Sequence, residues 1–226
     1  KNYQQQLATG TRLMVMVKAF AYGSGSFEIA SVLQYHNVDY LAVAYADEGV
    51  ELRKAGINLP IMIMNPDESA FDALIENNLE PELFSVSLLN AFASFLNKQG
   101  IQQYPVHIEL ETGMNRLGIA DYELPVLLEL LKTNIFKVQS IFSHLVASED
   151  PDQDVFTYQQ AALFNTLSGQ IQEVLPYPVI KHLLNTSGIS RHPSLQMDMV
   201  RLGIGLYGID NDQKNLTQVS TLRSTI

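Results

Sequence analysis

Leu13-Met-Val-Met-Val-Lys-Ala-Phe-Ala-Tyr-Gly-Ser-Gly25 is an apolar run that ends at one charged residue, Lys18, and continues through Tyr22 to two glycines. A short apolar run that leads into glycines is typical of a buried strand ending in a loop. Burial of an ammonium group is costly, so a lysine at this position favours the neutral amine that a nucleophile or a Schiff base requires. The alternative is a lysine whose alkyl chain follows the strand end out to solvent. The remaining motifs decide between these two interpretations.

The composition is that of one folded domain with an acidic surface. The 226 residues are 46% hydrophobic and 17% charged, which is enough for one full-sized core. The formal net charge of −10 argues against a nucleic-acid-binding surface. The sequence has no apolar run of membrane-spanning length, no signal-peptide pattern and no cysteine. We therefore expect a cytoplasmic protein without nucleic-acid or membrane partners. Because the sequence opens at Lys1 in a polar stretch, we also expect a fragment or a processed product.

Strand-like and helix-like segments alternate along the chain. Strands are predicted at residues 13–17, 40–44, 60–64, 82–85, 105–111, 138–143, 179–184 and 199–206. Helices are predicted at residues 27–35, 47–55, 67–76, 87–98, 121–133 and 152–174. Most of the strands are continuously apolar, as expected when both faces of a sheet are covered, and the alternation predicts parallel β/α units. Eight units in a chain of this length favour a closed (β/α)8 TIM barrel over an open doubly wound sheet.

The barrel is predicted to occupy residues 1–210. After Gly208 the sequence becomes polar and turn-like. We therefore expect residues 211–226 to be a linker at the start of a truncated C-terminal β domain.

Chemistry in such a barrel is found at the carboxyl ends of the strands, and the unusual residues of this chain fall there. They are Lys18 and Tyr22 after the first strand, Glu111-Thr-Gly-Met-Asn-Arg116 after the fifth, Ser143-His144 at the sixth, Asn185-Thr-Ser-Gly188 after the seventh, and Arg201 with Gly203-Ile-Gly-Leu-Tyr-Gly208 at the eighth. Five loops on one rim therefore hold nearly all the motifs that combine glycine with polar residues.

Three partial motifs point to other functions. The glycines from Gly203 to Gly208 match a dinucleotide fingerprint, but they lie late in the chain and do not open a predicted helix, so backbone N–H groups for a phosphate are the better interpretation. His107 and Glu109 form the one close ligand-type pair, without the spacing of a zinc site. Glu109 and Glu111 could act as paired carboxylates on a glycoside, but the sequence has no tryptophan and no evident sugar-binding aromatic cluster. None of these interpretations accounts for the rim as a whole.

Taken together, the rim motifs resemble those of alanine racemases, in the barrel domain that binds pyridoxal 5′-phosphate. The resemblance rests on the motifs Val17-Lys-Ala-Phe-Ala-Tyr-Gly-Ser-Gly25, Glu111-Thr-Gly-Met-Asn-Arg-Leu-Gly118, Ser143-His144, Asn185-Thr-Ser-Gly188 and Met199-Val-Arg-Leu-Gly-Ile-Gly-Leu-Tyr-Gly208. It extends over nearly the whole chain, and five motifs in the same order make it specific.

The resemblance implies a cofactor-binding role for several residues. Lys18 would hold pyridoxal phosphate as a Schiff base and act as the base on one face of the substrate. The phosphate and its surroundings would be bound by Tyr22, Asn185, Thr186 and the backbone of Gly203 and Ile204.

Two arginines and a histidine would complete the catalytic set. By the resemblance, Arg116 would lie beside the phenolic oxygen of the cofactor and the substrate carboxylate. Arg201 would donate to the pyridine nitrogen, with His144 behind it in a hydrogen-bond chain. Because arginine does not release its proton, the ring nitrogen would stay unprotonated and the cofactor would be a weaker electron sink, which favours reprotonation at Cα.

The chain departs from the family pattern in two places. Phe20 and Ser24 stand where the family loop commonly has asparagine and histidine. Glu109 stands where the family usually has a carbamylated lysine, and it would supply a permanent anion that orients Arg116. We therefore expect Glu109, Met114 and Arg116 to orient the substrate.

The activity implied by the resemblance is the racemisation of L- and D-alanine, an isomerase reaction that supplies D-alanine for peptidoglycan. Family members are homodimers in which a tyrosine from the partner's second domain is the other base, so we expect this chain alone to be weakly active or inactive. Alternatives are a single-domain pyridoxal-phosphate homeostasis protein, a racemase of another small amino acid such as serine, and an inactive barrel that serves as an interaction module.

Overall fold

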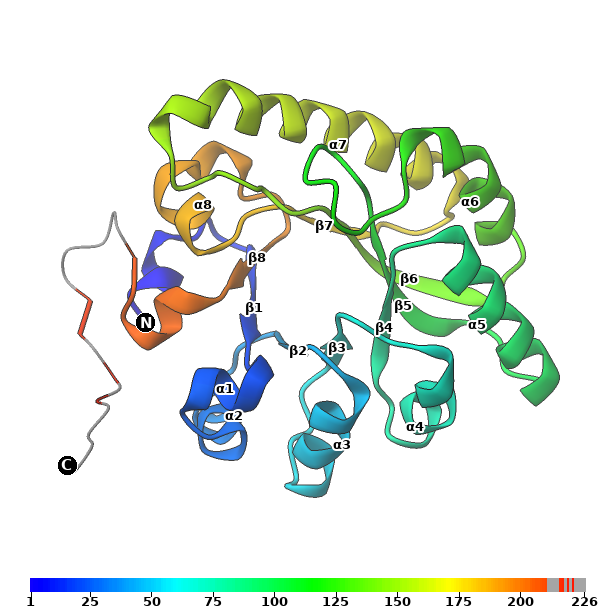
Figure 1. Cartoon of the computed structure of the whole chain (residues 1–226), viewed down its shortest axis with the longest axis horizontal. Helices are drawn as coiled ribbons and strands as arrows, with labels where there is room; N and C mark the ends of the chain where they lie inside the picture. Colours follow the sequence, from blue (N-terminus) through cyan, green and yellow to red (C-terminus); the bar gives the residue numbers. More distant parts are fainter. Residues whose placement is uncertain (211–215, 218, 220, 222–226) are drawn as a thin grey trace, which may run out of the picture.

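The computed structural model describes residues 1–210, 216, 217, 219 and 221, and its eight parallel strands close into a barrel in the order β1 to β8 (Figure 1). The strands are β1 (Arg12–Met16), β2 (Tyr40–Val43), β3 (Ile61–Ile63), β4 (Glu80–Leu83), β5 (Tyr104–Glu109), β6 (Phe136–Phe142), β7 (Ile180–His182) and β8 (Met199–Leu202). The predicted (β/α)8 barrel is confirmed.

Helices connect the strands and cover the outside of the barrel (Figure 1). The α-helices are α1 (Lys18–Gly23), α2 (Ser26–Tyr35), α3 (Ala46–Lys54), α4 (Phe71–Glu76), α5 (Val86–Gln99), α6 (Leu124–Leu131), α7 (Asp154–Val174) and α8 (Thr186–Arg191). The 3-10 turns are η1 (Tyr3–Gln6), η2 (Glu68–Ala70), η3 (Asp121–Glu123), η4 (Pro151–Gln153), η5 (Pro193–Leu195) and η6 (Ile204–Tyr207). No helix within the described residues is both long enough and apolar enough to cross a membrane.

Several predicted boundaries were wrong, and local sequence explains the shifts. The strand predicted at 82–85 lies two residues earlier, because the Ser85 side chain accepts a hydrogen bond from Leu88 N and caps α5. The strand predicted at 199–206 ends at Leu202, where Gly203 leads into η6. Loops were predicted where the short helices α1 and α8 lie. The predicted linker at 211–226 falls mostly outside the described residues.

Side chains alternate between the inside and the outside of the barrel. In β1, Leu13 and Val15 pack outward against the helices, whereas Met14 and Met16 fill the interior. The interior also buries polar side chains, which come from β4 to β8: Glu82, His107, Glu109, Ser140, His182 and Arg201. The polar interior lies directly beneath the rim motifs.

The first and last described segments close the barrel against each other. β1 pairs with β8, and the Tyr3 hydroxyl of η1 donates to Asp210, 2.7 Å away. The Gln196 side chain accepts a hydrogen bond from Ala8 N and donates one to the Gln6 carbonyl, and each donor–acceptor distance is 2.8 Å. Figure 1 shows the N-terminus beside the orange C-terminal segment.

Candidate active site

A cavity of about 320 Å³ lies at the carboxyl ends of the strands. All the residues predicted to bind the cofactor line it: Lys18, Tyr22, Arg116, His144, Asn185, Thr186, Arg201, Gly203 and Ile204. Met16, Met64 and Ser187 complete the wall. The fold therefore brings residues from all five rim motifs into one cavity.

The segment after Lys18 is a turn of left-handed helix. Ala19, Phe20, Ala21 and Tyr22 have φ values of 52°, 54°, 51° and 54°. This conformation costs roughly 1–2 kcal/mol per residue for an L-amino acid, and such strain is concentrated at functional sites. The turn brings the Tyr22 ring to 4.8 Å from the Tyr207 ring, between centroids. Lys18 and Tyr22 thus enter the same cavity from one short segment.

A polar cradle forms where Tyr22 and Thr186 meet the glycines after β8. The Thr186 hydroxyl oxygen accepts hydrogen bonds from Gly203 N at 3.0 Å and Gly205 N at 3.3 Å. A Cβ atom on Gly203 would lie 3.6 Å from both the Thr186 and the Tyr22 hydroxyl oxygens. Two hydroxyls and adjacent backbone therefore surround one small space, which suits an anion such as a phosphate.

Arg201 lies beneath this cradle, only 3% exposed. Its Nη2 donates to the carbonyls of Ser143 at 2.6 Å and Leu183 at 3.1 Å, and its Nη1 donates to His182 Nδ1 at 2.7 Å. Burial lowers the pKa of Arg201 to about 10, so the guanidinium stays charged at neutral pH. Arg201 also lines the cavity, and no described residue accepts a hydrogen bond from its Nε. This N–H is therefore available to a group that binds in the cavity.

The hydrogen-bond chain behind Arg201 passes through His182, and the prediction of His144 in that place was wrong. From His182 Nε2 the chain continues to Ser140 Oγ at 2.8 Å, to His107 Nδ1 at 2.6 Å, and from His107 Nε2 to Glu80 at 2.9 Å. Register explains the difference: His182 lies level with Phe142, whereas His144 follows two positions further toward the rim.

The chain has a definite direction. Because arginine only donates, Nδ1 of His182 must accept and its proton lies on Nε2, which donates to Ser140. Burial, with the charge of Arg201, holds the pKa of His182 well below its ordinary value, so the ring is neutral. The Glu80 carboxylate accepts from His107 at the other end. The sequence signal that could have found this chain is the inward position of these residues on adjacent strands.

His144 faces the cavity as a neutral ring. Burial, together with the positive charges of Arg201, Arg116 and Lys18, lowers its pKa to about 3. At neutral pH this imidazole therefore offers a flat neutral surface rather than a positive charge.

Two predicted residues lie outside the cavity. Met114 does not line it, and Glu109 is buried inside the barrel. No ion pair joins Glu109 to Arg116 among the described side chains; the hydrogen-bond partner of Glu109 is the Glu82 carboxyl. No motif in the sequence marks Glu82 as a site residue.

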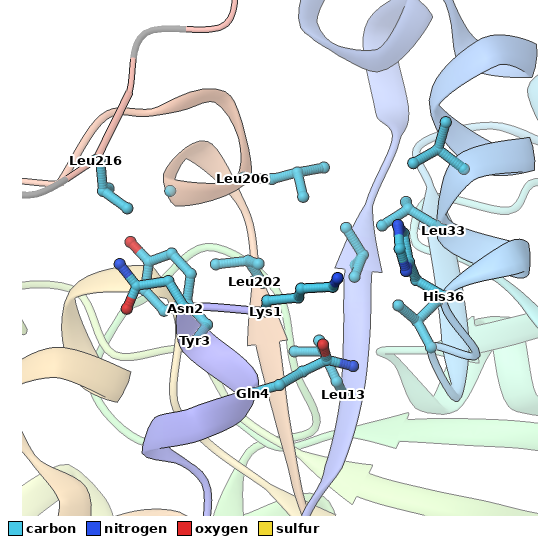
Figure 2. A pocket seen from close by; sticks show the side chains of 14 residues that line it. Lys1, Asn2, Tyr3, Gln4, Leu13, Leu33, His36, Leu202, Leu206 and Leu216 are labelled. Carbon is cyan, nitrogen blue, oxygen red and sulfur yellow. The ribbon is translucent and has the colours of Figure 1, made fainter.

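A separate apolar cavity of about 230 Å³ lies on the outer wall (Figure 2). It is bounded by η1, α2, β1 and the segment after β8. Leu13, Leu33, Leu202 and Leu206 form much of its lining. Among the described residues, the last rim motif alone reaches it, through Leu202, Gly205 and Leu206, so it is not the candidate site.

Comparisons with known proteins agree with the geometry. The family model described as "Alanine racemase, N-terminal domain" matches residues 1–211. An alanine racemase of Synechocystis sp. is 33% identical, over 100% of this chain and 62% of the relative. Alanine racemase 1 of Oceanobacillus iheyensis is 32% identical, over 100% of this chain and 60% of the relative.

Solved structures lead to the same comparison. An alanine racemase of Clostridium difficile 630 superposes with a TM-score of 0.88 at 30% identity, covering 96% of this chain and 58% of that one. An alanine racemase of Bartonella henselae, solved with covalently bound pyridoxal phosphate, has a TM-score of 0.83 at 28% identity, covering 96% of this chain and 61% of that one. The chain spans less than two thirds of the length of these relatives.

Proposed function

Because this chain belongs to the alanine racemase family, through the N-terminal domain of that family, we propose that it is the barrel domain of an enzyme that interconverts L- and D-alanine with pyridoxal 5′-phosphate. The observation that supports this most is the shared cavity, whose walls include every residue predicted to bind the cofactor. In this proposal the enzyme works in the cytoplasm, and its product is D-alanine for peptidoglycan.

The residues present fit the cofactor. Lys18 offers an amine, Tyr22 and Thr186 offer hydroxyls beside the Gly203 backbone, and Arg201 offers a buried N–H below them. When bound, pyridoxal phosphate supplies an electron sink that makes the Cα proton of an amino acid removable.

Each side chain then has a defined task. Lys18 holds the cofactor and takes or returns the Cα proton on one face of the substrate. Arg201 donates through Nε without transferring its proton, since the guanidinium cannot release it. Arg116 binds the substrate carboxylate, and neutral His144 packs in the cavity without adding charge.

In this proposal Glu109 takes the place of the carbamylated lysine of the family and supplies a permanent negative charge. Its charge raises the pKa of Arg201, opposing the effect of burial, so it acts on the arginine inside the barrel. Glu109→Gln should reduce turnover of the longer protein by about tenfold while cofactor attachment persists, as expected for a lost buried charge partner. Unchanged turnover would remove this role.

The rest of the proposal concerns the longer protein. A second domain starting within 211–226, a homodimer, and a second base on the partner subunit are proposed from the family membership. L-Alanine added to such a protein should yield D-alanine. Cofactor binding without any D-alanine formation would instead favour a homeostasis protein. Racemisation of serine but not of alanine would identify the protein as a serine racemase.

Cofactor attachment tests the core of the proposal on this chain. Pyridoxal phosphate is added, the absorbance is followed, the protein is reduced with borohydride, and the modified peptide is mapped. We expect the adduct on Lys18, its loss in Lys18→Arg, and its retention in Lys54→Arg, which changes an exposed lysine at the end of α3. Absence of a Lys18 adduct contradicts the proposal.

A further inference from the structure

Two carboxyl side chains contact each other inside the barrel. Glu82 on β4 is 1% exposed, Glu109 on β5 is 4% exposed, and a hydrogen bond joins them. Oε2 of each has no hydrogen-bond partner among the described residues. Since carboxylates only accept hydrogen bonds, a bond between them requires a proton on one of the two.

The surroundings show which groups act on this pair. Glu82 also lines a small cavity of about 170 Å³, and this cavity shares Lys18, Met64 and Arg116 with the main one. Arg201 faces the pair from β8, and Arg116 from the loop after β5. Burial raises the pKa of Glu82 well above its ordinary value, and the charge of Glu109 raises it further, against the two arginines.

We propose that Glu82 is a positioning residue that shares one proton with Glu109 and thereby fixes a single negative charge opposite Arg201 and Arg116. The inference rests on the proposed function, in which Glu109 acts as a permanent anion. Without Glu82, the Glu109 carboxylate would lose the hydrogen bond that orients it. With Glu82 ionised, two negative charges would compete for the same space.

The test is a pH titration of the whole chain without cofactor, with ¹³C at glutamate Cδ and ¹⁵N in the arginine side chains. We expect one glutamate resonance to remain that of a protonated acid well above the ordinary glutamate pKa of about 4.3. It should vanish in Glu82→Gln and titrate at lower pH in Glu109→Gln. The exposed Glu173→Gln is the matched control and should change neither.

Arg201 Nε supplies the readout of positioning. Its resonance should shift with pH at the same midpoint as Glu82 in the unaltered chain, and this shift should be absent in Glu82→Gln. The proposal is overturned if every glutamate titrates near the ordinary pKa of about 4.3. It is also overturned if Glu109→Gln leaves the Glu82 midpoint unchanged, or if neither variant changes the Arg201 resonance. Because no cofactor is present, these failures are separate from a missing Lys18 adduct.

Discussion

Phe20 occupies a backbone position that suits it poorly. It lies at φ 54° in the left-handed turn after Lys18, and its side chain is 63% exposed, so packing offsets little of the strain. Asparagine tolerates this conformation better than a bulky residue, because its short polar side chain can bond locally. The left-handed turn therefore favours asparagine, the residue common in the family loop, over phenylalanine at position 20.

We therefore expect Phe20→Asn to raise the free energy of unfolding by about 0.5–1 kcal/mol. Phe20→Ala is the control, since alanine removes the ring but keeps the left-handed penalty. Urea unfolding of the three proteins measures the difference. Equal stability of the asparagine and alanine variants would show that the turn does not determine the effect.

Glu82 makes the stability of the fold depend on pH. Below about pH 4.3 this side chain is protonated in both the folded and the unfolded chain. Above that pH only the unfolded chain releases the proton, because the folded pKa is raised. The folded state then binds more protons, so the free energy of unfolding falls as the pH rises, until the folded pKa is passed.

Glu82→Gln removes this dependence and keeps a donor toward Glu109. Its stability relative to the unaltered chain should increase by about 1.4 kcal/mol per pH unit between about pH 4.3 and the folded pKa. Guanidinium unfolding at several pH values checks this. Glu173→Gln, on the exposed side of α7, should give a difference that does not vary with pH; a flat difference for Glu82→Gln would contradict the argument.

At the scale of elements, one hydrogen-bond chain links four adjacent strands, β4 to β7, to Arg201 on β8. Each link comes from an inward-facing residue, so the chain depends on the stagger of the strands. Ser140 is its midpoint and is fully buried between His107 and His182.

Ser140→Ala should lower the free energy of unfolding by about 1–3 kcal/mol, because it leaves two buried ring nitrogens without a partner. It should also move the His182 ring resonances in NMR spectra. Ser168→Ala is matched in burial, but its hydroxyl donates only to the Asn165 carbonyl of its own helix, at 3.4 Å. That control should cost less than about 0.5 kcal/mol, and equal effects for the two serines would contradict the importance of the chain.

The strands and the rim loops could be predicted from sequence because both depend on local patterns. Apolar runs give strands, and the order of parallel strands alone places their following loops on one edge. The partner of Arg201 could not be predicted in this way. Whether His182 or His144 reaches it depends on register, and periodicity does not determine the alignment of His182 with Phe142. The Glu82–Glu109 pair could not be predicted for the same reason.

At the scale of the whole molecule, the barrel is closed by residues far apart in sequence. Tyr3 of η1 packs against the segment after β8, and its hydroxyl also reaches Asp210. Gly205 lies between Tyr3 and Thr186, and its N–H donates to the Thr186 hydroxyl. Closure of the barrel and the shape of the cradle therefore depend on the same glycine.

Gly205→Ala should be destabilising by about 1–3 kcal/mol, since the added Cβ would overlap the Tyr3 hydroxyl and the Thr186 methyl group. The Gly205 φ is not in the left-handed region, so steric overlap rather than backbone strain is the cause. Gly169→Ala is the control, because a Cβ there meets nothing within 4 Å and alanine favours a helix, so stability should rise by up to about 1 kcal/mol. Thermal unfolding measures both. Tyr3→Leu removes both Tyr3 atoms that the added Cβ would overlap, the hydroxyl oxygen and Cζ. If Gly205→Ala costs much less in the Tyr3→Leu background than in the unaltered chain, the contact between the first and last segments sets the cost; if it costs the same, the cost arises at Thr186 and the cradle alone.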